Sequence, residues 1–173
     1  MKNLAEPQKK SLFKGFSHFI LLLLGLFLLS SSSLFAQQYF PLSEFMEENE
    51  VEYGDKTYNL IFGADPSISI SQGIVTYPSA PYPQCLNTDI SSIGNLRNED
   101  SKFRTVKAVT IKINSDSEKS ALRLTPDYLK QFTNLQYVVI RSAVPLSDNE
   151  VRSMVSGFGE DSILVLYEYA IPV

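Results

Sequence analysis

The segment LQYVVI at residues 135–140 has the residue content of a buried β-strand, and its pattern recurs on both sides at one spacing. Counting 29 residues back gives VKAVTI at 106–111, and counting 29 forward gives LVLYEY at 164–169. The shared apolar or aromatic positions are the first, fourth and sixth: Val106, Val109 and Ile111; Leu135, Val138 and Ile140; Leu164, Tyr167 and Tyr169. We therefore predict three equivalent strands, within residues 103–113, 135–140 and 163–169.

A helix is predicted in each of the two intervals between these strands. The first begins at Thr125-Pro126-Asp127, because threonine caps helices, proline fits the first turn and aspartate suits the positive helix end. The second begins with a capping box of Ser147 and Glu150, and its apolar residues follow at helical spacing: Val151, Met154, Val155 and Phe158. Strands joined by single helices should be parallel, with right-handed crossovers.

This arrangement resembles a leucine-rich repeat, a family whose units run about 20–29 residues and pair one strand with one helix or irregular return. The resemblance covers residues 103–173 and departs from the family after each strand: its asparagine occurs at Asn114, but Ala143 and Pro172 stand in the next two units. An ordinary α/β domain with evenly spaced strands fits the same residues. The expected fold class is α/β, with a short leucine-rich-repeat-like β-α-β-α-β parallel sheet in the C-terminal half.

The resemblance implies that one sheet face binds a protein or peptide, because a curved parallel sheet offers a rigid, extended surface. Tyrosine and arginine are frequent at the energetic centres of interfaces, so Tyr137 and Arg141 are the strongest candidates. The predicted binding residues alternate with the core positions: Thr110, Lys112, Tyr137, Val139 and Arg141. The alternative is that a second layer, built from residues 43–102, covers this face.

Residues 37–102 read as a small, irregular, β-containing region that precedes the repeat-like part at 103–173. We predict an irregular segment at 37–41, a short helix at 43–50, a strand or hairpin at 51–62 and one bulged or two short strands at 67–77. Three prolines between Tyr77 and Pro83 predict an extended loop, since proline cannot sit inside a sheet. Residues 87–102 are polar and predict no regular strand.

The first 36 residues have the three parts of a bacterial secretory signal peptide. Four lysines precede an apolar run at 19–29, serines follow, and Ala36 is a small residue suited to the cleavage site. A membrane span needs about 20 apolar residues, and this run has 11, so a cleaved leader is favoured over a retained anchor. We expect residues 37–173 to form a single secreted, periplasmic or cell-envelope domain with no stable membrane span.

Residues 37–173 contain 11 basic and 18 acidic residues, a formal charge of −7, which disfavours nucleic acid as a partner. The only histidine, His18, lies in the leader, so histidine-based triads and the usual zinc and copper ligand sets are missing. Cys85 is the only cysteine; it is either a packing residue or a reactive thiol. We predict no cofactor and no metal.

These observations favour a non-enzymatic protein- or peptide-binding module. Two alternatives stay open. One is a small hydrolase that uses two carboxylates in a cleft near the loop from Tyr77 to Cys85. The other is a structural component that packs into a larger envelope complex, in which case a large apolar patch should be exposed.

Overall fold

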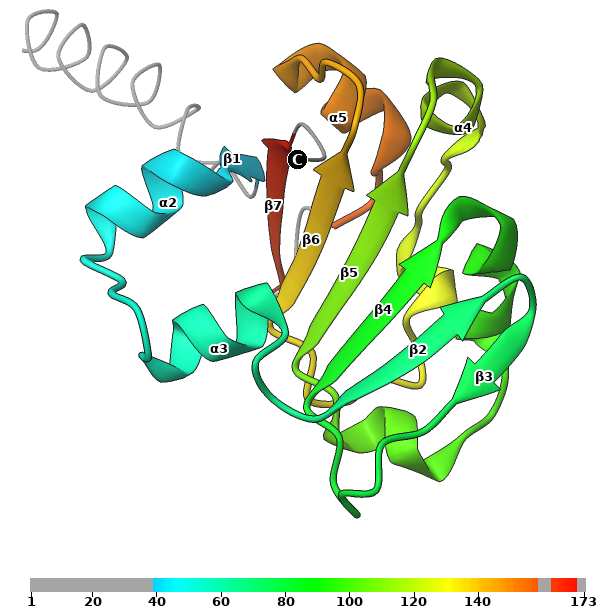
Figure 1. The fold of residues 1–173 in the computed structure, drawn as a ribbon. Helices are drawn as coiled ribbons and strands as arrows, with labels where there is room; N and C mark the ends of the chain where they lie inside the picture. The colour runs from blue at the N-terminus through cyan, green and yellow to red at the C-terminus, as the bar shows by residue number, and fades with distance from the viewer. Residues whose placement is uncertain (1–38, 159–162, 171–173) are drawn as a thin grey trace, which may run out of the picture. The chain divides into compact units, whose positions relative to one another are not determined.

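A seven-stranded sheet in the order β1-β7-β6-β5-β4-β2-β3 organises the computed structural model (Figure 1). The structure describes residues 39–158 and 163–170, so the predicted leader lies outside the described residues. The strands are β1 (Tyr39–Pro41), β2 (Ser67–Ser71), β3 (Ile74–Thr76), β4 (Cys85–Asp89), β5 (Ala108–Ile113), β6 (Tyr137–Ser142) and β7 (Leu164–Tyr169). The α-helices are α2 (Leu42–Glu48), α3 (Lys56–Phe62), α4 (Asp116–Ala121) and α5 (Asp148–Met154), and the 3-10 helices are η2 (Ile90–Arg97), η3 (Ser101–Thr105) and η4 (Pro126–Tyr128).

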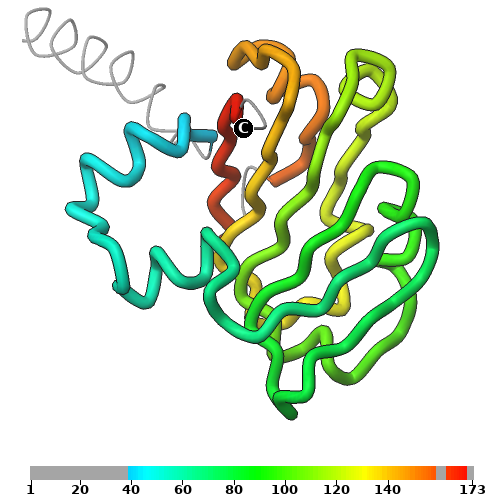
Figure 2. The backbone as a smooth tube through the Cα atoms, viewed as in Figure 1, coloured from blue at the N-terminus to red at the C-terminus, as the bar shows by residue number. Residues whose placement is uncertain are grey.

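The sheet is parallel except for the β2–β3 hairpin. The predicted α/β class and the parallel neighbours β5, β6 and β7 are therefore confirmed. The chain path in Figure 2 brings β1 beside β7, so the two ends of the described chain share one edge of the sheet.

The predicted spacing holds for one pair of strands and is wrong for the next. Val109 lies opposite Val138, as a 29-residue spacing requires. Val138 lies opposite Val165 rather than Tyr167, so β7 follows β6 at 27 residues. A shift of two residues keeps every side chain on its face, because strand side chains alternate with a period of two. The hydrophobic pattern alone could not exclude this shift.

Each face of the sheet is covered by its own layer. On one face, aligned apolar residues from five strands pack against the segments that connect β4 to β7: Ile68, Leu86, Val109, Val138 and Val165. On the other face, Leu42 and Phe45 of α2 and Ile61 of α3 pack on Val139 and Leu166. Leu60 of α3 covers Cys85 and Ala108.

Helix α3 corrects the strand or hairpin predicted at 51–62. Its tyrosine, isoleucine and phenylalanine content resembles a strand, but Leu60 and Ile61 are adjacent residues that are both buried against the sheet. Alternation would have exposed one of them. Asp55 stands at the N-cap position, and Gly63 has φ +69° just after the helix. Asp55 and Gly63 are both residue types typical of helix ends, and a prediction based on strand propensity does not take them into account.

Residues 37–102 contain strands, as predicted, but they do not merely precede the parallel sheet, because they contribute four strands to it. The short strand β1 lies in the segment predicted to be irregular at 37–41. Strand β4 was not predicted, since Asn87 and Asp89 are poor strand formers. It forms because β2 and β5 supply parallel partners on both of its sides. The predicted strands at 67–77 are confirmed as the β2–β3 hairpin.

The first predicted interval helix is wrong in position, and the second is confirmed. The helix between β5 and β6 is α4, capped by Ser115, whose Oγ accepts a hydrogen bond from the Glu118 amide. At Thr125 there is only the short 3-10 helix η4. Helix α5 begins at the expected capping box of Ser147 and Glu150.

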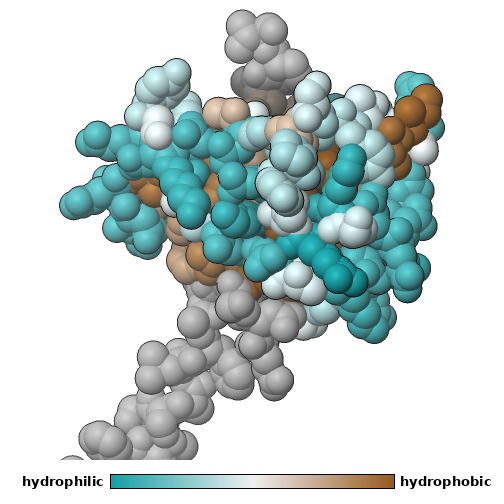
Figure 3. All heavy atoms as spheres, turned by 90° about the horizontal axis from the view of Figure 1, so that it is seen from below, coloured by the Kyte–Doolittle hydropathy of each residue, from teal (hydrophilic) through white to brown (hydrophobic). Residues whose placement is uncertain are grey.

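The surface seen from below in Figure 3, toward the amino ends of the parallel strands, is mostly hydrophilic, with apolar residues in small groups. Among the described residues, every helix is too short or too polar to serve as a transmembrane span.

Candidate functional site

The order in which the chain visits the strands predicts where a crevice should lie. The crossover from β1 to β2 carries α2 and α3 along one face, from one edge of the sheet to the other side of β4. The later crossovers return in the opposite direction and cover the other face. Right-handed crossovers require this change of face when the direction reverses. In open α/β sheets, ligand crevices form at the carboxyl ends of two strands whose following connections run to opposite faces of the sheet.

A groove of about 360 Å³ lies at this place. One wall is the junction of β1 and α2, with Leu42 and Met46; another is Phe62 at the end of α3. Leu146, from the loop that leads to α5, and the last residues of β7 complete it. Most of its lining is apolar, and Phe62 and Tyr169 at its border are 38% and 49% exposed.

Arg141 is held beside the groove by three different partners. Its Nε lies 2.7 Å from Oε1 of Glu168, a groove residue on the neighbouring strand, at an angle that makes an ion pair rather than a hydrogen bond. Its Nη2 donates a hydrogen bond of 3.3 Å to the Ile61 carbonyl, and its guanidinium carbon lies 4.9 Å from the Phe62 ring centroid. These contacts connect α3 to the carboxyl ends of β6 and β7 and orient the Phe62 wall.

Tyr167 connects the groove to α5. Its hydroxyl donates a 2.6 Å hydrogen bond to Oδ1 of Asp148. Burial, this hydrogen bond and the negative charges of Asp148 and Glu44 raise the pKa of Tyr167 well above its usual range. The Tyr167 hydroxyl is therefore a neutral hydrogen-bond donor. Asp148 and Glu44 both lie close enough to this groove residue to act on it electrostatically.

The residues predicted from the repeat resemblance do not form one exposed surface, and this expectation is corrected. Val139 and Thr110 are 0% and 4% exposed, and Tyr137 packs edge-to-face on Phe45 of α2 with ring centroids 5.9 Å apart. The second layer considered as an alternative, α2 with α3, covers them. Lys112 stays exposed at the carboxyl end of β5, whereas Arg141, at the carboxyl end of β6, is half-buried against the end of α3.

Three groove residues, Tyr167, Glu168 and Tyr169, lie on a strand that was predicted, but the groove itself was not. Phe62 and Leu146 come from segments whose sequence carries no site signal. The alternation of β7 does place Glu168 on the face of Arg141, and a correct register would have predicted their ion pair.

The cleft considered for a hydrolase was expected near the loop from Tyr77 to Cys85, whereas the groove lies at β7. In that loop the Tyr77 hydroxyl donates to Asp100, and Lys102 lies 4.1 Å from the Tyr77 ring centroid. Cys85 is buried, and burial with the nearby Asp65 charge raises its pKa to about 11. Its thiol is therefore protonated at neutral pH, as expected of a packing residue rather than a nucleophile.

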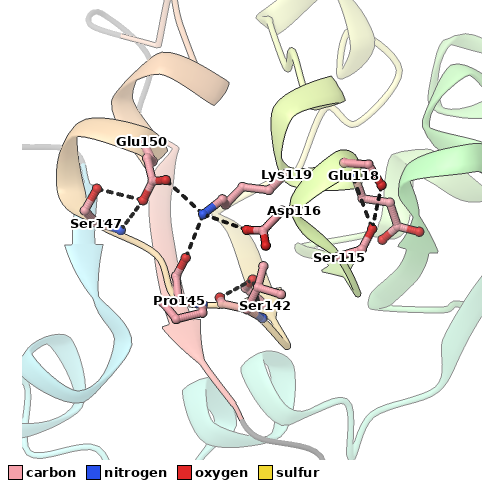
Figure 4. Close-up of polar contacts among 10 residues, drawn as sticks. Ser115, Asp116, Glu118, Lys119, Ser142, Pro145, Ser147 and Glu150 are labelled. Carbon is pink, nitrogen blue, oxygen red and sulfur yellow. Dashed lines mark hydrogen bonds and ion pairs between the residues drawn. The ribbon is translucent and has the colours of Figure 1, made fainter.

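Lys119 holds together the connections that follow β5 and β6 (Figure 4). Its Nζ lies 2.9 Å from Glu150 and 3.2 Å from Asp116, and it donates to the Pro145 carbonyl at 3.1 Å. Hydrogen bonds from Lys119 and then Ser147 lower the pKa of Glu150 to about 2. The network positions the loop that places Leu146, next to Pro145, in the groove.

Asp89 secures the carboxyl end of β4. It accepts hydrogen bonds from the Ser71 and Ser91 hydroxyls, at 2.8 and 2.6 Å, and from the Ser92 amide, at 2.8 Å. Burial raises the pKa of Asp89, but these bonds and one from the Gln72 amide outweigh it and lower the pKa to about 2. The carboxylate thereby joins the β2–β3 hairpin to the start of η2.

We expect Asp89→Ala to lower the free energy of unfolding at pH 7 by about 1–2 kcal/mol, the usual effect of losing an N-cap with additional hydrogen bonds. The pKa of Asp89 is lowered by folding from 3.8, so its contribution is complete above that pH and is lost as the pH falls toward 2. Urea unfolding at pH 7, 4 and 2.5 measures this, with the exposed Glu99→Ala as control. A difference between wild type and variant that grows toward low pH would contradict the assignment.

In the described ranges, 39–158 and 163–170, no three or more histidine, cysteine, aspartate or glutamate residues are grouped so that they could hold a metal ion. Comparison of the chain with protein-family models, with curated proteins and with solved structures gave no match.

Proposed function

We propose that residues 37–173 form an exported, non-enzymatic module that binds a protein or peptide segment in the groove beside β7. The secretory features of residues 1–36 support a secreted, periplasmic or cell-envelope location. The module is proposed to have leucine-rich-repeat-like architecture.

The proposed architecture is supported by strand order and by the layer of connecting segments. From β4 to β7 each strand pairs in parallel with the next one in the chain, as it would in a solenoid of repeats. Leu124 and Val155, from successive connections, also form a parallel bridge, so neighbouring units touch on the connecting side as well as in the sheet.

The observation that carries the proposed function is the groove itself. It combines a largely apolar lining with two exposed aromatic side chains, Phe62 and Tyr169, and lies beside the tethered Arg141. Buried apolar pockets with aromatic and arginine borders are typical of energetic centres in protein interfaces. The groove lies at the carboxyl ends of parallel strands, where open α/β sheets most often bind ligands.

Selection of peptides from a random display library on the immobilised protein tests this proposal. We expect convergent sequences whose affinity falls at least about tenfold in the variant Phe62→Ala/Tyr169→Ala. Tyr82→Ala is the matched control, because Tyr82 is an aromatic residue that is 72% exposed on the proline-rich loop. Failure to enrich any convergent sequence, or equal binding by the groove variant and the wild type, would overturn the proposal.

A further inference from the structure

One wall of the groove begins an acidic segment of the chain. Residues 42–55, which begin at the groove wall, contain six acidic residues and no lysine or arginine. All five glutamates of this segment have exposed side chains: Glu44, Glu47, Glu48, Glu50 and Glu52. The potential that a ligand meets as it approaches this wall is therefore negative.

Three carboxylates are close to the groove itself. Glu168 lines it, Asp148 accepts the hydrogen bond from Tyr167, and Glu44 acts on the same hydroxyl through its charge. Two cations also face this region: Arg141 is paired with Glu168, and Arg152 lies near enough to Tyr167 to affect it. One negative charge is left over locally, and the exposed Glu47 and Glu48 of α2 add to it.

The end of β7 extends beyond its edge partner β1. The pairing of β1 with β7 ends at Tyr167, and β7 continues to Tyr169. Leu164 and Ala170 donate their backbone N–H groups toward β6, so by alternation the N–H and C=O of Tyr169 face the outer edge, past β1 and beside the groove. An extended peptide could add main-chain hydrogen bonds there while one side chain enters the groove.

From this combination we infer that the ligand is an extended peptide segment with an apolar side chain flanked by lysine or arginine. The apolar side chain occupies the space between Met46, Phe62 and Leu146, and the flanking cations face Glu44 and Asp148. This inference rests on the proposed peptide-binding function and specifies the chemistry of its partner. Glu44 and Asp148 form the acidic rim of the groove. A peptide with acidic residues beside its apolar side chain would be repelled by this rim.

Three labelled peptides test the inference by fluorescence anisotropy on the full chain, purified after export. One carries Lys-Leu-Lys between Gly-Ser flanks, the second Glu-Leu-Glu and the third Lys-Ser-Lys. We expect Lys-Leu-Lys to bind at least about tenfold more tightly than either other peptide, and its advantage over Glu-Leu-Glu to shrink with added salt. Equal binding of Lys-Leu-Lys and Lys-Ser-Lys would show charge attraction without use of the groove and would overturn the inference.

Protein variants separate the rim from the groove. Glu44→Gln/Asp148→Asn should reduce the advantage of Lys-Leu-Lys over Glu-Leu-Glu at least about threefold, whereas Glu99→Gln, which removes an exposed charge elsewhere, should not. Glu44→Gln alone changes one exposed helix side chain and provides the same test if the double variant is unstable. An unchanged advantage in both rim variants would overturn the inference.

The outcomes also distinguish this inference from the proposed function. If Lys-Leu-Lys and Glu-Leu-Glu bind equally, and Phe62→Ala/Tyr169→Ala weakens both, the charge preference is wrong while the peptide groove stands. If none of the three peptides binds, the inference is wrong, and the result of the library selection decides the proposed function independently.

Discussion

Phe103→Ala is expected to lower the free energy of unfolding by about 4 kcal/mol, the largest effect of any substitution considered for this chain. Phe103 in η3 and Phe132, after η4, are both buried and stack with ring centroids 4.8 Å apart and an interplanar angle of 10°. They join the connections on either side of β5. Removing one ring leaves a cavity that both connections border.

Urea-induced unfolding of the wild type and the variant measures the effect. Arg104→Ala, at an exposed neighbouring position, is the control and should change stability by less than about 0.5 kcal/mol. A cycle with Phe132→Ala should show a coupling of about 0.5–1.5 kcal/mol between the two rings. Independent, additive effects would mean that the two connections do not pack together as described.

Phe45→Ala should lower the free energy of unfolding by about 3 kcal/mol, because the Phe45 ring fills the hydrophobic cluster between α2, α3 and the sheet. Phe45 is buried with Leu42 and Ile61 over Val139 and Leu166, and it contacts the Tyr137 ring edge-to-face. It is the main side chain of α2 that covers the sheet face predicted to bind ligand.

The matched control is Glu48→Ala on the exposed side of the same helix, for which little change is expected. Thermal or urea unfolding distinguishes the two variants directly. A loss below about 1 kcal/mol for Phe45→Ala would mean that α2 contributes little to the fold.

Helices α2 and α3 cover much of the sheet face that the repeat resemblance predicts to bind a ligand. In a solenoid with an open sheet, the side chains between the core positions would meet the ligand. In this chain α2 and α3 cover that face over parts of β4 to β7, whereas Lys112 at the carboxyl end of β5 stays exposed. Of the predicted binding residues, Lys112 and Arg141 lie at the carboxyl ends of their strands, and Arg141 contacts two residues that line the groove, Phe62 and Glu168.

Local sequence signals were sufficient for the elements whose partners are near in the chain. Apolar alternation located β5, β6 and β7, and the capping box located the start of α5. Each of these elements carries its own apolar face, so burial and local propensity favour the same structure. Helix α4 also had a capping signal at Ser115 and Glu118, but it has no buried residue and so lacks the periodicity that reveals a helix.

Only tertiary structure decided β1, β4, α3 and the groove. Strands β1 and β4 are stabilised by neighbours distant in the chain, and α3 is a helix because Leu60 and Ile61 both find apolar partners on the sheet. The groove brings together residues from four separate segments. The amino-acid order thus determined the apolar strands β5, β6 and β7, the acidic charge and the absence of histidine from residues 37–173, since each is a property of local residue types. Which face is covered and where a ligand could bind depended on packing between distant segments, which no local pattern encodes.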